Sequence, residues 1–360
     1  MRNQVIDIAK GVGILTVVIC HNWILSHDRG EFSRVVFSFH MPLFFFISGV
    51  FFKPDLSFKN TFFSKASSLL KPYTVIIIAL ILVDLIRGKI TGRLFNVYDA
   101  LIKGLYSSTF TLDWVQLWFL SHLFTIFLFS WLLYRLVLKH LNSRNAQLLT
   151  ILGLFYIGIQ IINVFWVKYF DPFGINTMLY GKNPHFLGLP FNIDILLVTA
   201  PIFLAGFLFS REILAFKFNH FLFWSSLLLF TFLHYEFDYT MALHDRQYDQ
   251  FFVTTCQMVT GIYLVFGSAA LIAKVSMVSK ILAYLGNASL FILIFHFYIQ
   301  HIFIGVFQYH FPQYNYQIAL IGFVISITYS IVIYNIVIKY PTLKILFFDT
   351  SKKLISYPTK

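Results

Sequence analysis

Four ionisable side chains interrupt the first two apolar segments of the chain. Asp7, Lys10 and His21 fall within one apolar run, and His40 opens a His-Met-Pro triplet in the next. Ionisable groups inside apolar helices are costly in lipid and therefore indicate function, although a polar pair can also simply hold helices together. Because imidazole exchanges protons near neutral pH, the two histidines are typical of acid–base catalysis.

The spacing of these residues indicates their depths in the segments. A helical rise of about 1.5 Å per residue separates Lys10 from His21 by roughly 16 Å, which places the lysine near one mouth of the helix and the histidine deeper. The residue count puts His40 at a depth similar to that of His21. Pro42 predicts a helix break beside His40, because proline leaves a backbone carbonyl without its donor. Two histidines at one level next to a break favour a reaction centre over a packing contact.

Other polar residues in apolar segments carry less weight. His122, His234 and His301 each stand alone in the sequence, and a hydrogen bond between helices explains each at least as well as chemistry. Lys65 and Lys71 flank the entry to the third apolar segment. They fit ordinary membrane-surface anchors and a binding site for an anionic cytosolic ligand equally well.

Several well-known catalytic motifs are absent from the sequence. It contains no Walker phosphate loop, no His-Glu-x-x-His zinc site and no Gly-x-Ser-x-Gly nucleophile elbow. We therefore expect no metal, no ATP-driven transport and no zinc hydrolysis. Histidine acid–base chemistry and passage along a polar path remain.

The composition identifies the solvent of the elements that carry these residues. Hydrophobic residues make up 58% of the chain and charged residues only 12%, with a mean hydropathy of +0.76. Runs of roughly 20 apolar residues recur along the whole chain, as transmembrane helices require. The sequence predicts an all-α, polytopic membrane bundle that forms one domain over residues 1–360. About ten helices are expected, near 5–26, 33–52, 66–86, 115–138, 147–168, 193–210, 218–234, 251–273, 281–304 and 316–338.

The distribution of charge predicts the orientation of this bundle. Lysine and arginine are more numerous in the loops on the side of the termini than in the alternate loops, which predicts cytoplasmic termini. The net charge of +12 is spread over short loops, so we expect no nucleic-acid partner. The longer loops, near 87–114, 169–192 and 235–250, then lie on the outer side. They include the turns Asp171–Gly174 and Gly181–His185 and could form a docking surface for an external substrate.

The order of the motifs resembles the membrane acyltransferase-3 family, which O-acylates cell-surface polysaccharides and related glycans. Lys10 and His21, with ten residues between them, resemble the family's basic-x10-His motif, although arginine is commoner at the basic position and binds phosphate more specifically. Residues 39–49, Phe-His-Met-Pro-Leu-Phe-Phe-Phe-Ile-Ser-Gly, are similar to the signature of its second helix. Shorter matches follow in order at Lys71-Pro72-Tyr73, Leu117-Trp118-Phe119-Leu120, Phe203-Leu204-Ala205-Gly206 and Tyr284–Leu290 with His296.

This resemblance implies an activity and a location. It implies transfer of an acyl group, usually acetyl from acetyl-CoA, to a sugar hydroxyl of a glycan or lipid-linked saccharide such as O-antigen, lipopolysaccharide or capsule. The enzyme would span the cytoplasmic (inner) membrane of a bacterium. The implied roles are catalysis by His21 and His40, acyl-donor binding by Lys10, Lys65 and Lys71, and substrate binding or structural support by Asp7, Trp118 and His296.

The cytosolic donor and the external acceptor must meet inside the bundle. We expect the phosphates of CoA to lie near the cytoplasmic lysines while the pantetheine arm reaches His21, the general base. No Asp or Glu in the sequence is obviously placed to orient His21. A transporter or flippase for a glycan or lipid-linked intermediate is the main alternative, and a structural assembly subunit is a weaker one.

Overall fold

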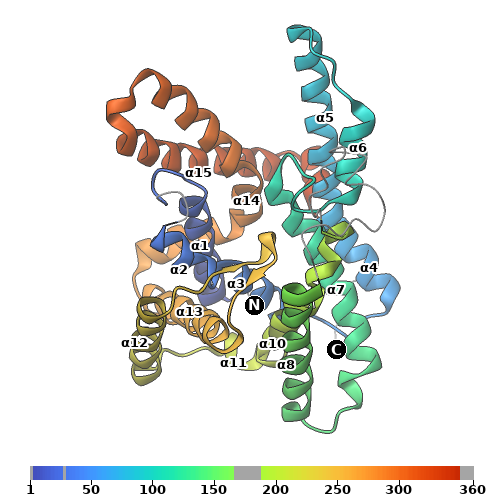
Figure 1. Cartoon of the computed structure of the whole chain (residues 1–360), viewed down its shortest axis with the longest axis vertical. Helices are drawn as coiled ribbons and strands as arrows, with labels where there is room; N and C mark the ends of the chain where they lie inside the picture. Colours follow the sequence, from blue (N-terminus) through green and yellow to red (C-terminus); the bar gives the residue numbers. More distant parts are fainter. Residues whose placement is uncertain (1–2, 27–29, 166–187, 349–360) are drawn as a thin grey trace. The chain divides into compact units, whose positions relative to one another are not determined.

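A computed structural model of the chain describes residues 3–26, 30–165 and 188–348 (Figure 1). Nearly all of the described regular structure is helical. The predicted turns Asp171–Gly174 and Gly181–His185 lie outside the described residues. The α-helices are α1 (Gln4–Cys20), α2 (Glu31–Phe37), α3 (His40–Val50), α4 (Phe58–Lys65), α5 (Lys71–Thr91), α6 (Val97–Tyr106), α7 (Trp118–Leu136), α8 (Arg144–Gln160), α10 (Leu196–Leu208), α11 (Ser210–Leu214), α12 (His220–Glu236), α13 (Phe251–Ile272), α14 (Ser276–His310), α15 (Asn315–Lys339) and α16 (Pro341–Phe347).

Short elements connect these helices. Strands β1 (Met241–Ala242) and β2 (Gln247–Tyr248) pair antiparallel, with Met241 opposite Tyr248. The remaining turns are η1 (Ala66–Leu70) and η4 (Ile161–Phe165), which are π-helical, and the 3-10 turns η2 (Val115–Leu117), η3 (Leu138–His140), η5 (Pro190–Ile195), η6 (Leu243–Asp245) and η7 (Pro312–Tyr314).

The structure confirms the predicted all-α membrane bundle. Among the described residues, 8 helical segments are long and apolar enough to cross a membrane. They correspond to eight of the ten helices expected from the sequence. The other two expected helices are α1 and α12, which have 17 residues each and are shorter than those eight.

Two predicted helix boundaries differ in the structure. The helix expected over residues 5–26 ends at Cys20, and the side chain of Asn22 accepts a hydrogen bond from the Leu25 amide at 3.1 Å. Such local side-chain bonds replace the helical ladder. The helix expected over 33–52 is interrupted between α2 and α3, just before His40. Pro42 therefore lies in the first turn of α3, where the missing amide hydrogen costs little.

The chain packs as two compact units that are interleaved in the sequence. Unit 1 comprises residues 1–52, 148–163 and 201–335, and unit 2 comprises 53–147, 164–200 and 336–360. The single domain over 1–360 stays a prediction. Each unit is described by itself.

Unit 1 is built around the contact between α1 and α14. Both helices carry a glycine at the point of closest approach: a side chain on Gly11 would overlap the Leu282 carbonyl, and one on Gly286 would overlap the Asp7 carbonyl. Small residues are what allow helix backbones to approach closely in lipid. The core formed there comprises Ile14, Val17, Val18, Leu285, Ala288 and Ile292. This contact fixes the axis of α1 and with it the position of His21.

A second close approach in unit 1 positions α3. A side chain on Gly49 of α3 would overlap the Phe203 carbonyl of α10, and one on Gly206 of α10 would overlap the Phe46 carbonyl of α3. Two glycines on opposite helices thus permit the same contact from both sides. It holds the helix that begins at His40.

Unit 2 contains a buried polar network around the start of α7. Asn192 accepts hydrogen bonds from the amide and hydroxyl of Thr109 at 3.2 and 3.0 Å and donates to the Ser107 carbonyl at 3.3 Å. His122 binds in the same region, to Phe191 and Thr199. The network satisfies polar groups that would be costly to bury unpaired.

Candidate active site

Side-chain hydrogen bonds connect the end of α1 to two other helices of unit 1, α14 and α15. Asn22, which is fully buried, donates from its amide to the Ala319 carbonyl of α15 at 2.9 Å. Gln300 of α14 donates to the Val18 carbonyl at 3.4 Å. Carbonyls in the last turn of a helix have no partner within that helix, so side-chain donors are needed there. These bonds fix the residue between them, His21.

The hydrogen bonds of His21 assign its ring nitrogens. Nδ1 lies 2.8 Å from the Val17 carbonyl oxygen. A carbonyl can only accept, so Nδ1 carries the hydrogen, and in the neutral ring the lone pair is then on Nε2. Among the described residues, none forms a hydrogen bond to this Nε2. A backbone carbonyl thus performs the orientation for which the sequence suggested no carboxylate.

His296 of α14 lies directly against His21. The two ring centroids are 5.1 Å apart with the rings at 70° to each other. His296 is fully buried, and its Nδ1 donates to the Ile292 carbonyl at 2.6 Å. Its Nε2 is buried and has no hydrogen-bond partner within the described part of the chain. A buried polar atom without a partner is costly and uncommon in folded proteins.

His301, one turn further along α14, supports the same corner. Its ring forms a hydrogen bond to the backbone of His21, and it packs on Phe297 and Trp23 with centroid distances of 3.9 and 4.4 Å. The structural interpretation left open for this histidine fits these contacts. It positions the backbone of the neighbouring histidine.

His40 occupies the first position of α3 and is 4% exposed. Its Nδ1 donates to the Val36 carbonyl at 2.9 Å, the same arrangement as in His21. The Phe37 ring lies 5.1 Å from the His40 ring and 5.7 Å from the ring of His244. His21, His40 and His244 are near enough for their charges to interact. The similar depth predicted for His21 and His40 is consistent with this proximity.

His244 is a member of this site that the sequence analysis did not single out. It lies in the 3-10 turn η6 between β1 and β2, and its Nε2 is 3.3 Å from a carboxylate oxygen of Asp245. The signal for it was its place in the 235–250 loop, which was predicted to form a docking surface. We refer to His21, His40, His244, His296 and His301 as the histidine cluster.

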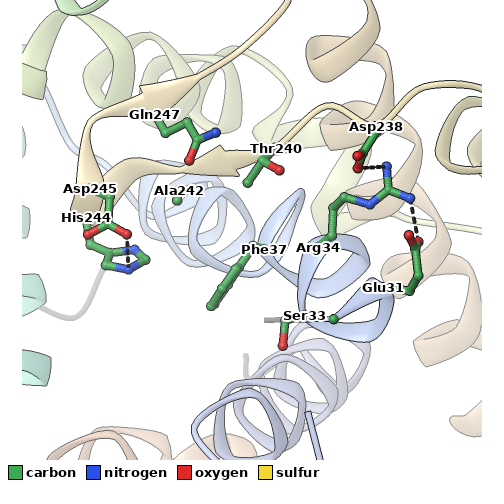
Figure 2. A pocket seen from close by; sticks show the side chains of 11 residues that line it. Glu31, Ser33, Arg34, Phe37, Asp238, Thr240, Ala242, His244, Asp245 and Gln247 are labelled. Atoms are coloured by element: carbon green, nitrogen blue, oxygen red, sulfur yellow. Dashed lines mark hydrogen bonds and ion pairs between the residues drawn. The ribbon is translucent and has the colours of Figure 1, made fainter. Parts of the chain in front are cut away.

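A cavity of about 420 Å³ opens beside the histidine cluster. It lies between α2 and the β1–β2 hairpin, and Figure 2 shows Phe37 between the His244–Asp245 pair and the Arg34 ion pairs. Its lining residues are Gly30, Glu31, Ser33, Arg34, Phe37, Asp238, Thr240, Ala242, His244, Asp245 and Gln247. The cavity belongs to unit 1, as does every member of the histidine cluster.

Two of the remaining predicted site residues lie in α1. Asp7 is buried and stands in the first turn, where a carboxylate interacts favourably with the helix dipole. Lys10 holds its ammonium 5.5 Å from the centre of the Phe51 ring, a cation–π contact within unit 1. α1 is helical from Gln4 to Cys20, so the spacing of roughly 16 Å expected between Lys10 and His21 applies.

The other predicted residues lie in unit 2. Lys65 places its ammonium 3.8 Å from the centre of the Phe127 ring, and Lys71 donates to the Phe348 carbonyl at 2.8 Å. The Trp118 ring is 5.7 Å from that of His122. These contacts all lie within unit 2, and the roles assigned to the three residues stay predictions.

Comparison with known proteins identifies the family of the chain. Residues 3–335 match the acyltransferase-3 family, whose model describes an acyltransferase domain. No curated protein and no solved structure matches the chain. The match covers α1 through most of α15 and so includes the whole histidine cluster. Together with the membrane-spanning helices, it shows that this chain belongs to the acyltransferase-3 family and is a membrane acyltransferase.

Proposed function

We propose that the protein transfers acetyl from acetyl-CoA to a hydroxyl of a cell-surface saccharide. The observation that supports this most directly is the His21 ring, whose Nδ1 hydrogen is held by the Val17 carbonyl. That bond leaves Nε2 as the acceptor of a proton, which is what deprotonation of a sugar hydroxyl requires. Membership of an acyltransferase family supplies the reaction class.

The proposed transfer has two steps. His21 Nε2 takes the proton of the acceptor hydroxyl while the hydroxyl oxygen attacks the thioester carbonyl carbon. The tetrahedral adduct then expels the CoA thiolate, the carbon–sulfur bond breaks, and the imidazolium returns its proton to sulfur. The products are the O-acetyl ester and free CoA, and His21 is regenerated.

The neighbouring histidines would serve this transfer in different ways. The His296 ring packs against the His21 ring and would restrict the rotation of that ring, which acts as the base. His40, with its Nδ1 also held by a carbonyl, would carry a proton on Nε2 only when charged, and it would then polarise the thioester carbonyl. His301 would hold the His21 backbone through the bond to it.

The donor would approach from the N-terminal end of α1. Lys10 stands there, roughly 16 Å from His21 by helical rise, a separation that a pantetheine arm can bridge. Its ammonium would attract the phosphates of CoA. The distribution of lysine and arginine supports cytoplasmic termini in a bacterial inner membrane, which brings this end of α1 to the cytosolic donor.

The test compares surface glycans from a host lacking the gene with glycans after restoration of the wild type, His21→Ala or His310→Ala. His310 is an exposed residue at the end of α14 and serves as the matched histidine control. Mass spectrometry before and after mild alkali should reveal a base-labile acetyl group with the wild type and the control. It should be absent with His21→Ala at equal membrane abundance.

Two results would contradict the proposal. Acetylation retained in His21→Ala would exclude this histidine as the base. An unmodified glycan that disappears from the surface or accumulates inside the cell when the gene is absent would favour transport of the glycan.

A further inference from the structure

The cavity beside the histidine cluster has the size of a ligand site. Its volume of about 420 Å³ falls within the range of about 300–1,000 Å³ found for small-molecule sites. Glu31 and Asp238, whose side chains are 77% and 92% exposed, line it, so it is open to water. His244, a member of the histidine cluster, also lines the cavity, and so does Phe37, which contacts the rings of His244 and His40. A ligand bound there would therefore extend from water toward the reacting groups.

The lining of the cavity suits a ligand rich in hydroxyl groups. Only Gly30, Phe37 and Ala242 among the lining residues lack a polar side-chain group. Sites for apolar small molecules are instead lined predominantly by hydrophobic side chains. Carboxylates accept hydrogen bonds from hydroxyls, and the Gln247 amide can both donate and accept. This lining favours a saccharide.

The charges of the cavity disfavour an anionic ligand. Arg34 is its one lysine or arginine, and both terminal nitrogens are engaged: Nη1 with Asp238 at 3.0 Å and the Phe237 carbonyl at 2.7 Å, and Nη2 with Glu31 and the His234 carbonyl. Its side chain is 10% exposed, and its buried Nε has no partner among the described residues. Both terminal nitrogens of Arg34 are thus bonded to groups of the protein, so neither is open to an anionic ligand.

The cavity is lined by more acidic side chains than lysine or arginine side chains. Glu31, Asp238 and Asp245 all line the cavity, so three carboxylates outnumber its basic side chains, Arg34 and His244, and the fixed charge is negative. The phosphates of an acyl-CoA would be repelled, which makes this an unsuitable donor site. A carboxylate on a sugar would be repelled for the same reason, whereas a neutral or amino sugar would not.

From these observations we propose that the cavity binds the acceptor saccharide and selects neutral or amino sugars over sugars that carry a carboxylate. This inference rests on the proposed function and specifies its acceptor class. Phe37 supplies an apolar surface beside the histidine cluster, and the carboxylates bind hydroxyl groups toward the mouth. The acceptor hydroxyl would then enter near His244 and His21.

The test uses the purified full chain with labelled acetyl-CoA and two glycosides that differ only at C6, methyl galactoside and methyl galacturonide. Wild-type protein should favour the neutral glycoside by at least about tenfold in kcat/KM, because a like charge in a binding site is repelled. Gln247→Lys puts a cation on an exposed lining residue and should reduce this preference about tenfold.

Two further variants test whether the carboxylates at the entrance of the cavity cause the preference for the neutral glycoside. Glu31→Gln/Asp238→Asn removes both carboxylates that occupy Arg34, and it should also improve the use of the galacturonide. Glu236→Gln removes an exposed carboxylate two residues from Asp238 that does not line the cavity. It should leave the preference unchanged, so a general effect of net charge is excluded.

The outcomes separate this inference from the proposed function. Suppose that the hydrolysis of acetyl-CoA depends on His21. If both glycosides are then used equally, or if Gln247→Lys leaves the preference unchanged, the inference is overturned while the proposed function stands. Where neither glycoside is acetylated, the shift in melting temperature measures binding, and equal binding or none also overturns it. Selective binding of the neutral glycoside without any His21-dependent transfer supports the cavity and contradicts the proposed function.

Discussion

The histidine cluster of unit 1 and His122 of unit 2 illustrate two uses of a buried histidine. His122 is fully buried, and both of its ring nitrogens are engaged, Nδ1 with the Phe191 carbonyl at 3.1 Å and Nε2 with the Thr199 hydroxyl at 2.9 Å. Within the described residues, His21 forms a side-chain hydrogen bond only through Nδ1. A proton can be exchanged with a substrate only through a nitrogen that the protein leaves available. The two sites therefore differ in chemistry although both histidines occur in apolar sequence.

The surroundings of His122 explain why both of its ring nitrogens form hydrogen bonds. Phe191 and Asn192 adopt positive φ angles of 57° and 55°, which side chains disfavour. His122 and Thr109 hold this turn through hydrogen bonds to its carbonyl and side-chain oxygens. The histidine is thus part of the support for an unusual backbone, whereas in unit 1 the backbone supports the histidine.

The largest expected difference between the two regions is in catalysis. His21→Ala should lower acetyl transfer by about 10²–10⁴-fold, the usual contribution of a general base. His122→Ala should change the rate per folded molecule by no more than a few-fold. Turnover normalised to folded protein measures both. A larger rate loss in His122→Ala than in His21→Ala would break the comparison.

The position of the unit 1 site depends on the close approach of α1 and α14. Gly286→Ala would place a methyl group into the Asp7 carbonyl and should cost about 1–3 kcal/mol through overpacking. It should also slow transfer by moving His21. Gly153→Ala in α8 is the control, because no atom lies within 4 Å of the added group. Thermal unfolding in detergent should separate the two, and equal stability would contradict the assigned contact.

Substitution of His122 in unit 2 should lower the stability of the protein. His122→Ala leaves the Phe191 carbonyl and the Thr199 hydroxyl with fewer partners, so we expect a loss of about 1–3 kcal/mol. Thr199→Val removes the other side of one of these bonds. If the two residues act as one network, the double variant should lose less stability than the sum of the single variants. Strict additivity in denaturant unfolding would argue against the network.

The smallest expected effect is at His301. His301→Phe keeps a ring against Phe297 but removes the hydrogen bond to the His21 backbone. A single interhelical bond in a membrane contributes about 0.6 kcal/mol on average, so stability should change little. Transfer should fall about threefold through kcat, with the KM for acetyl-CoA unchanged. An altered KM with an unchanged kcat would exclude a positioning role.

Some of the site could be predicted from the sequence because the relevant signals are local. Ionisable residues in apolar runs singled out His21 and His40, and the proline after His40 indicated the adjacent break. His244 escaped this search, because a histidine in a polar loop is not unusual. Its place beside Phe37 depends on the hairpin packing near α2, which is a contact between distant segments.

The sequence by itself determined that the chain is a helical membrane protein, because apolar runs of this length can satisfy their backbone only as helices in lipid. It also determined which family motifs are present. Only the tertiary structure decided which histidine nitrogens are available for chemistry. The Val17 carbonyl accepts a hydrogen bond from Nδ1 of His21, whereas the Thr199 hydroxyl occupies Nε2 of His122. Hydrogen-bond satisfaction depends on the atoms that packing brings within about 3 Å, and residue order alone does not specify them.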